Sequence, residues 1–170
     1  MVKAFDYEGL RFYRVNQVPL PSVTTILNET REPRAVKALA DWKARTSESE
    51  QRSACDRGTA VHKMVERYFN HEPQDPIALD QYGEFWESLK PVLPKIRPLY
   101  VEEFLWSDFG YAGRCDCWGM VDDKFTMIDF KTTNKPKKRE WCVDHLCQLI
   151  AYSAALKERK GRSTEQRWWL

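Results

Sequence analysis

The sequence predicts an α+β fold with one central mixed sheet flanked by helices, and three observations lead to this prediction. Apolar residues recur at helical spacing in the first half of the chain and again after residue 141, whereas from residue 99 they alternate with a period of two. Helices followed by a run of antiparallel strands and a further helix form a layered α+β or mixed α/β architecture. The 170 residues, 42% of them hydrophobic, are enough to build the core of a single domain.

The first half of the chain is predicted to form a β-hairpin and four helices. The hairpin covers residues 5–15 with its turn at Glu8-Gly9, because strand-forming residues stand on both sides of this turn. The polar stretch RTSESEQRS is expected to lead into the third helix. The four helices are expected after the N-cap Ser22, after Pro33, over Arg57–Phe69 and over residues 78–93.

The second half is predicted to form three antiparallel strands, a helix and a last strand. The segment LYVEEFLWS, from residue 99, is the first strand, and the next two strands surround an Asp122-Asp123 loop. The basic segment NKPKKRE is expected to be a loop. A helix over CVDHLCQLIAYSAALKER and one more strand in GRSTEQRWWL complete the chain.

The composition limits the class of protein. A formal net charge of only +2 means that any contact with nucleic acid must come from local clusters of basic residues. No apolar run approaches the ~20 residues of a membrane span, and the segment MVKAFDYEGLRFY lacks the features of a secretory or transit sequence. We therefore expect a cytoplasmic protein with no membrane partner.

The predicted hairpin GRCDCWGMVDDKFTMIDFKTT places charged residues among apolar ones. Pairing outward from its loop puts Asp116 opposite Asp129, and cross-strand neighbours lie about 4.5–5.5 Å apart. Lys131, two residues beyond Asp129, is on the same face of its strand. Two carboxylates this close raise each other's pKa unless a cation lies between them. The pattern therefore favours a Mg²⁺ or Mn²⁺ site with oxygen ligands.

A second interpretation of the same residues stays open at this point. An exposed strand face with a charge-paired lysine and two unrelated acids fits the D-x-K spacing equally well. Glu102 or Glu103, on the preceding strand, can supply another carboxylate, and His62 lies on a predicted helix, where an isolated histidine is more often packed or solvated than a ligand. Gln148 and Tyr152 are one helical turn apart, so both can point at the same partner.

The five cysteines are expected to be buried or half-buried thiols, because an odd number without a secretory context argues against a disulfide framework. Structural zinc sites use paired C-x₂₋₄-C spacings. Two groupings in the sequence fit that pattern poorly: Cys115 with Cys117, and Cys142 with His145 and Cys147.

Five segments in order resemble the PD-(D/E)XK nucleases, specifically the RecB-type exonuclease branch. They are RGTAVH, VEEFLWS, GYAGRCD, MIDFKTT and QLIAY, which match the motifs G-x-x-x-H, E, G-x-x-D, D-x-K and Q-x-x-x-Y. With PSVTTIL and LADWKAR, the likeness runs from about Pro21 to Tyr152 and is similar to the mitochondrial genome-maintenance exonuclease and its small phage relatives. It implies a restriction-endonuclease-like core in a single domain, with a hairpin and helices over 1–97 and the catalytic sheet and helix over 98–170.

The resemblance also implies roles for individual residues. Glu102 fits the strand glutamate better than Glu103, and Gln148 would hold the catalytic lysine or the nucleic acid. The implied catalytic residues are Lys131, Asp116, Asp129, Glu102 and Gln148. The implied metal ligands are the side chains of His62, Asp116 and Asp129 and the carbonyl group of Phe130.

Contacts with nucleic acid are implied for residues outside the metal site. Ser22 and Thr24, at a helix N-terminus, are expected to contact a phosphate, although simple helix capping explains Ser22 equally well. Tyr152 would lie beside Gln148. Lys135 and the basic residues after it form a solvated loop that can steer the nucleic-acid backbone.

The function implied by the resemblance is hydrolysis of phosphodiester bonds by a Mg²⁺- or Mn²⁺-dependent DNA exonuclease at single-stranded ends. Trp42, Tyr68 and Trp106 are compatible with base stacking but are predicted to lie in the core. No iron–sulfur cluster is expected, because relatives with a cluster place three cysteines beyond Q-x-x-x-Y and this chain has none after Cys147.

The expected partners are single-stranded DNA and proteins of replication or recombination, in the cytoplasm of the host if the protein comes from a phage. Two alternatives stay open. The first is an endonuclease of the same fold that cuts duplex or branched DNA. The second is a nucleic-acid-binding module without catalytic activity.

Overall fold

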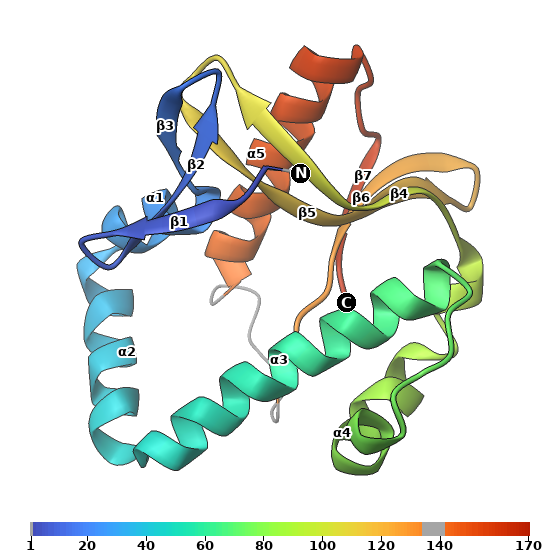
Figure 1. Cartoon of the computed structure of the whole chain (residues 1–170), viewed down its shortest axis with the longest axis horizontal. Coiled ribbons are helices and arrows are strands. Elements are labelled where there is room, and N and C mark those ends of the chain that lie inside the picture. Colours follow the sequence, from blue (N-terminus) through green and yellow to red (C-terminus); the bar gives the residue numbers. More distant parts are fainter. Residues whose placement is uncertain (1, 134–141) are drawn as a thin grey trace.

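The computed structural model describes residues 2–133 and 142–170 and shows an α+β structure with two β-sheets (Figure 1). In the larger sheet the strand order is β4-β5-β6-β7; the first three strands are antiparallel, and β7 runs parallel to β6. Their bounds are Ile96–Ser107 (β4), Tyr111–Val121 (β5), Lys124–Asp129 (β6) and Gln166–Trp169 (β7). The predicted α+β class with a mixed sheet is confirmed.

The smaller sheet is an antiparallel meander of three strands, Ala4–Tyr7 (β1), Leu10–Val15 (β2) and Val18–Pro21 (β3). Glu8 and Gly9 have positive φ angles of 51° and 77° and form the predicted turn between β1 and β2. The third strand was not expected from the sequence. A parallel bridge between Ser22 and Ala112 joins the end of this small sheet to β5.

Helices cover both faces of the larger sheet. Helices α1 and α5 pack on one face, where Val23, Leu149 and Leu156 share a core with residues of β5 and β6. Helices α3 and α4 pack on the other face through Met64 and Trp86. The helix bounds are Val23–Glu29 (α1), Pro33–Arg45 (α2), Glu48–Phe69 (α3), Pro76–Leu89 (α4), Leu93–Lys95 (the short 3₁₀ helix η1) and Val143–Lys160 (α5).

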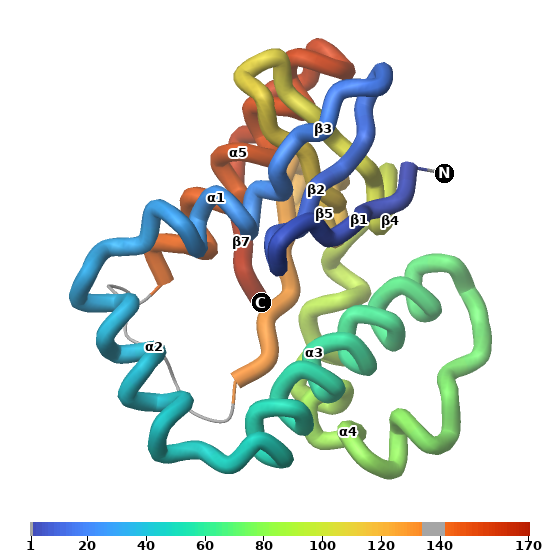
Figure 2. Tube along the Cα trace, turned by 60° about the vertical axis from the view of Figure 1, so that its left-hand side comes forward, coloured from blue at the N-terminus to red at the C-terminus, as the bar shows by residue number. Residues whose placement is uncertain are grey.

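Helix α2 lies outside both cores. It runs from the end of α1 to the start of α3 along one side of the molecule (Figures 1 and 2), and none of its residues is buried. Trp42, which was predicted to lie in the core, is 41% exposed on this helix. Tyr68 and Trp106 are half-buried, and the ring of Tyr68 packs edge-on against Trp86. The prediction of a core position is therefore wrong for Trp42.

Some predicted boundaries need correction. Helix α3 begins at Glu48, so most of the polar stretch RTSESEQRS is helical; Ser47 caps the helix and forms a capping box with Glu50. Helix α4 begins two residues earlier than predicted and ends before Pro91. Strand β4 begins at Ile96, so the expected division between residues 97 and 98 falls inside a strand.

None of the five cysteines forms a disulfide. Cys115, Cys117 and Cys142 are buried, as predicted, whereas Cys55 and Cys147 are exposed, so the prediction of buried or half-buried thiols is wrong for these two. Burial raises the pKa of Cys117 to about 12. Among the helices of the described residues, none combines the length and the apolar character needed to span a bilayer.

Candidate active site

The β5–β6 hairpin has the predicted register. Asp122 and Asp123 form its loop with φ angles of 47° and 59°, the positive values that a two-residue type I′ turn requires. This register brings Asp116 next to the end of β6, where the backbone N–H of Phe130 donates a hydrogen bond of 2.7 Å to Asp116 Oδ2. The paired residues run from Val121–Lys124 to Cys117–Ile128.

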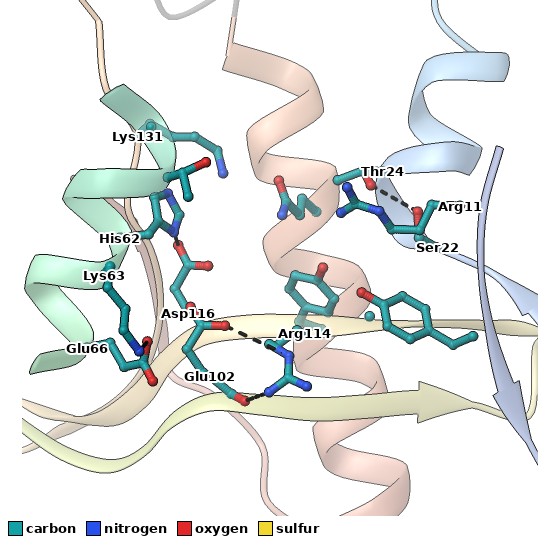
Figure 3. Close-up of a pocket in the computed structure, with 16 residues that line it drawn as sticks. Arg11, Ser22, Thr24, His62, Lys63, Glu66, Glu102, Arg114, Asp116 and Lys131 are labelled. Carbon is teal, nitrogen blue, oxygen red and sulfur yellow. Dashed lines mark hydrogen bonds and ion pairs between the residues drawn. The ribbon is translucent and has the colours of Figure 1, made fainter. Parts of the chain in front are cut away.

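Three side chains from three elements converge beside Asp116. His62 comes from α3, Glu102 from β4 and Asp116 from β5, and one possible ligand atom from each lies within 4.8 Å of the other two. His62 Nδ1 is 3.4 Å from Asp116 Oδ2, and Figure 3 shows the ring of His62 directed at that carboxylate. This group of one imidazole and two carboxylates has the composition of a site for a divalent cation.

Glu102 reaches this group because the backbone of β4 departs from a regular strand. Its φ angle is +54°, which is uncommon for a residue other than glycine and is a local strain typical of functional positions. Val101 packs with the α3–α4 core and Glu102 faces His62 of α3, so both consecutive side chains lie on the α3 side of the sheet. Glu103 lies elsewhere: it accepts a hydrogen bond from Trp118 Nε1 and pairs with Lys160.

Asp129 and Lys131 form an ion pair next to this group. Asp129 is buried, with 1% of its surface exposed, and Lys131 Nζ contacts its Oδ2. Asp129 Oδ1 is also buried and has no hydrogen-bond donor among the described residues. Two backbone hydrogen bonds from Leu170 fix this segment: Leu170 N–H donates to the carbonyl of Asp129, and Lys131 N–H donates to the carbonyl of Leu170.

Burial and mutual repulsion raise the pKa values of two acids of the site. Burial, and then the charge of Asp116, raises the pKa of Glu102 to about 7. The same two causes raise the pKa of Asp129 above its ordinary value, although Lys131 acts in the opposite direction. Burial lowers the pKa of His62, but hydrogen bonding to Asp116 and the charge of that carboxylate outweigh this and raise it. A bound cation would relieve this repulsion.

A cavity of about 590 Å³ opens over the site. His62, Glu102, Asp116 and Lys131 line one side of it, whereas Asp129 and Phe130, the other two predicted metal ligands, are buried and are not among its lining residues. The structure therefore brings together the predicted histidine, glutamate, first aspartate and lysine around one open space. The other predicted residues that line it are Ser22, Thr24, Gln148 and Tyr152.

The predicted phosphate-contacting residues have defined local roles. The hydroxyl of Ser22 caps α1 by accepting a hydrogen bond of 2.9 Å from the backbone N–H of Thr25, and it is also 2.9 Å from the hydroxyl of Thr24. Ser22 is thus a helix cap that also lines the cavity. Lys135, predicted to contact the nucleic-acid backbone, lies outside the described residues.

Gly113 explains how Tyr152 reaches the cavity. A Cβ atom at Gly113 would lie 2.7 Å from the phenol oxygen of Tyr152, so only glycine lets α5 place this ring against β5. Tyr152 is buried, and Gln148, one helical turn earlier on α5, lines the same cavity. The glycine at position 113 therefore has a packing reason, independent of any chemistry.

Several charged residues of the cavity were missed by the sequence reasoning. Glu66 follows His62 by one helical turn and Arg114 precedes Asp116 by two strand positions, so the periodicity could have identified both. Arg11 comes from the N-terminal hairpin, and no local pattern links that hairpin to the site. The charged residues newly found in the cavity are Arg11, Lys63, Glu66 and Arg114.

The metal-free protein is expected to lose stability as the pH rises from about 4.5 to about 7. Glu102 has an ordinary pKa of 4.5 and a pKa of about 7 in the folded protein. The folded state therefore binds more protons in this range, and the free energy of unfolding falls with rising pH. For this partly buried group the loss is on the order of 1–3 kcal/mol and is complete above the folded pKa.

Urea unfolding in EDTA across this pH range measures the effect. Glu102→Gln should reduce the decline in the free energy of unfolding. The part of the decline that is due to Asp129 and His62, whose pKa values are also raised, should remain. Glu103→Gln is the control, because Glu103 neighbours Glu102 but lies in another environment. A Glu102→Gln variant that keeps the full decline of the parent protein contradicts the assignment.

Comparison with known proteins adds no family to this description. The sequence matches no model of a protein family, and it matches no curated protein. The function proposed below therefore depends on the residues that surround the cavity.

Proposed function

We propose that this protein is a metal-dependent deoxyribonuclease that hydrolyses phosphodiester bonds at the ends of single-stranded DNA. The observation that carries the proposal is the convergence of His62, Glu102 and Asp116 beside the Asp129–Lys131 ion pair on one cavity. The strand order β4-β5-β6-β7, with helices on both faces, supports the further proposal of a restriction-endonuclease-like core.

The donor set fits a hard divalent cation. Glu102 and Asp116 offer carboxylate oxygens, which suit Mg²⁺ and Mn²⁺, and His62 offers an imidazole nitrogen. Burial and the charge of Asp116 raise the pKa of Glu102, and Asp129 Oδ1 has no donor among the described residues, so a cation bound here would stabilise the ionised carboxylates. When bound, such an ion supplies charge neutralisation at the scissile phosphate and favours ionisation of the attacking water.

The other residues have roles that follow from their positions. The ammonium group of Lys131 lies at the edge of the cavity, where it can orient the attacking water or stabilise the charge that develops on the phosphate. Asp129 holds that ammonium group in place. Gln148 and Tyr152 bound the same space from α5 and are placed to contact the strand that enters it.

The preference for single strands is supported by two features. A cavity of about 590 Å³ has room for the end of a flexible strand. Trp42 is 41% exposed on α2, and an exposed aromatic ring can stack on bases and so bind single strands without sequence preference. The same site chemistry would serve an endonuclease, so the shape of the DNA substrate distinguishes the two activities.

The decisive experiment compares DNA substrates and metals. End-labelled linear single strands, circular single strands and duplexes are incubated with the protein in Mg²⁺, Mn²⁺ or EDTA. We expect cleavage of the linear single strands with either ion and none in EDTA, because the acids of the site lack a cation there.

Three other outcomes would contradict the proposal in different ways. Nicked circular strands would indicate an endonuclease. Binding without cleavage, unaffected by EDTA, would indicate a non-catalytic binding module. Cleavage in EDTA at the rate measured in Mg²⁺ would show that the group of His62, Glu102 and Asp116 is not a metal site.

A further inference from the structure

The cavity has a basic end that the proposed metal chemistry does not use. Arg11, from β2, lines the cavity together with Ser22 and Thr24. Figure 3 shows Arg11 extending from the N-terminal strands into the open space, across from His62 and Asp116. The acidic cluster and Arg11 therefore face the same volume from opposite sides.

Arg11 differs from the other cations of this cavity because the described part of the chain offers it no acidic partner. Among the described residues, no carboxylate oxygen lies within the 4.0 Å of an ion pair from its guanidinium group, and this includes Asp6, its cross-strand neighbour in β1. Each other cation of the lining has such a partner: Lys63 with Glu66, Arg114 with Glu102 and Lys131 with Asp129.

The base of the Arg11 side chain is fixed, although the side chain itself is exposed. The N–H of Arg11 donates to Thr25 Oγ1 (3.2 Å), and its carbonyl accepts hydrogen bonds from the N–H of Ser22 (2.9 Å) and from Thr25 Oγ1 (3.0 Å). Ser22 and Thr25 are both buried. These contacts hold Arg11 at the start of α1 and reduce the freedom that it would lose on binding a ligand.

We propose that Arg11 binds a phosphate of the substrate strand adjacent to the phosphate that is cleaved, an inference that rests on the proposed nuclease function. A guanidinium group binds phosphate oxygens through two parallel hydrogen bonds. A cation at His62, Glu102 and Asp116 neutralises only the phosphate beside it, and the next phosphate of the strand needs its own positive group. Arg11 is a positioning residue that sets how far the strand enters the cavity.

The salt dependence of DNA binding tests this inference directly. The affinity for a labelled single-stranded oligonucleotide is measured by fluorescence anisotropy over a series of salt concentrations, with Ca²⁺ in place of the catalytic ion. Each phosphate contact on a single strand contributes about 0.7 to the slope of log K against log salt. We expect Arg11→Ala to reduce the slope by about this amount and Arg11→Lys, which keeps the charge, to restore it.

Arg14→Ala is the matched control. Arg14 lies on the same strand and is also exposed, but it does not line the cavity, and its guanidinium packs over the ring of Phe5. Its removal should leave the slope unchanged. In the cleavage assay, Arg11→Ala should raise KM by about 5- to 10-fold with little change in kcat, as expected for a group that binds substrate and transition state equally.

Two forms of the oligonucleotide, with and without a 5′-phosphate, identify the phosphate. If Arg11→Ala reduces the slope for both forms, Arg11 contacts an internal phosphate. If it reduces the slope only for the phosphorylated form, Arg11 contacts the terminal phosphate. A slope for Arg11→Ala equal to that of the parent protein overturns the inference, and so does an equal loss for Arg14→Ala. If the slope falls as expected but no metal-dependent cleavage occurs, the phosphate site stands and the nuclease proposal fails.

Discussion

Asp129→Asn is expected to abolish cleavage and, at the same time, to make the metal-free protein more stable. Asp129 is 1% exposed, and its Oδ1 has no donor among the described residues. Burial and the charge of Asp116 raise its pKa, so the ionised form opposes folding at neutral pH. Asparagine keeps the shape of the side chain and removes the charge.

The expected loss of cleavage is about 10³-fold or more, because Lys131 loses the group that holds its ammonium and the proposed metal site loses a nearby negative charge. The expected gain in the free energy of unfolding is about 1–2 kcal/mol near pH 8. The sign of this gain and its pH range follow from the raised pKa of Asp129. An acid whose pKa is higher in the folded state opposes folding at every pH at which it is ionised in that state. The gain should therefore disappear at low pH.

Cleavage rates in Mn²⁺ and urea unfolding in EDTA measure the two effects on the same preparations. Asp123→Asn is the control, because the side chain of Asp123 is 90% exposed in the hairpin loop, outside the cavity. It should cleave like the parent protein. A variant at Asp129 that retains cleavage, or that unfolds more easily than the parent protein at pH 8, contradicts the electrostatic account of this residue.

The register of the β5–β6 hairpin could be predicted because it depends on local chemistry. Asp122 and Asp123 tolerate the positive φ that a two-residue turn demands, and once this turn is set, each further pair of the ladder follows. Asp116 was therefore placed beside the end of β6 without any long-range information. The same locality explains the correct N-cap at Ser22, whose hydroxyl bonds to a backbone group three residues away.

Elements without an apolar pattern were missed or shortened. Strand β3 contains Pro19 and Pro21, and proline argues against a strand unless the strand lies at the edge of a sheet, as β3 does. The first turns of α3 are polar because they lie outside both cores, so only the capping box of Ser47 and Glu50 marks their start. Trp42 was assigned to the core together with Tyr68 and Trp106, and nothing in the sequence shows that its helix stays exposed.

The candidate site was predictable only as far as strand and helix periodicity extend. The choice between Glu102 and Glu103 depends on a backbone φ of +54°, which breaks the alternation that a sequence argument must assume. Arg11 enters the cavity because the small sheet is joined to β5 by the bridge from Ser22 to Ala112. Contacts of this kind depend on the packing of distant segments and leave no local signal.

Lys131→Ala is expected to lower the rate of cleavage by about 10²- to 10³-fold while it strengthens the binding of Mn²⁺. The ammonium group of Lys131 occupies the neighbourhood of the proposed metal, where its charge acts on Asp129 and on His62. Its removal takes one positive charge away from the site, so a divalent cation meets less repulsion there. The charge that develops on the phosphate, however, loses its stabilising partner.

Mn²⁺-dependent thermal shifts give the affinity for the ion, and cleavage at saturating Mn²⁺ gives the rate. Lys63→Ala is the matched control, because Lys63 lines the same cavity but pairs with Glu66 on its own helix. The contrast with Asp129→Asn is the sharpest test: both variants should lose cleavage, but only the aspartate variant should bind Mn²⁺ more weakly than the parent protein. If the lysine variant loses cleavage and metal affinity in parallel, Lys131 acts by keeping Asp129 in place and has no direct part in the reaction.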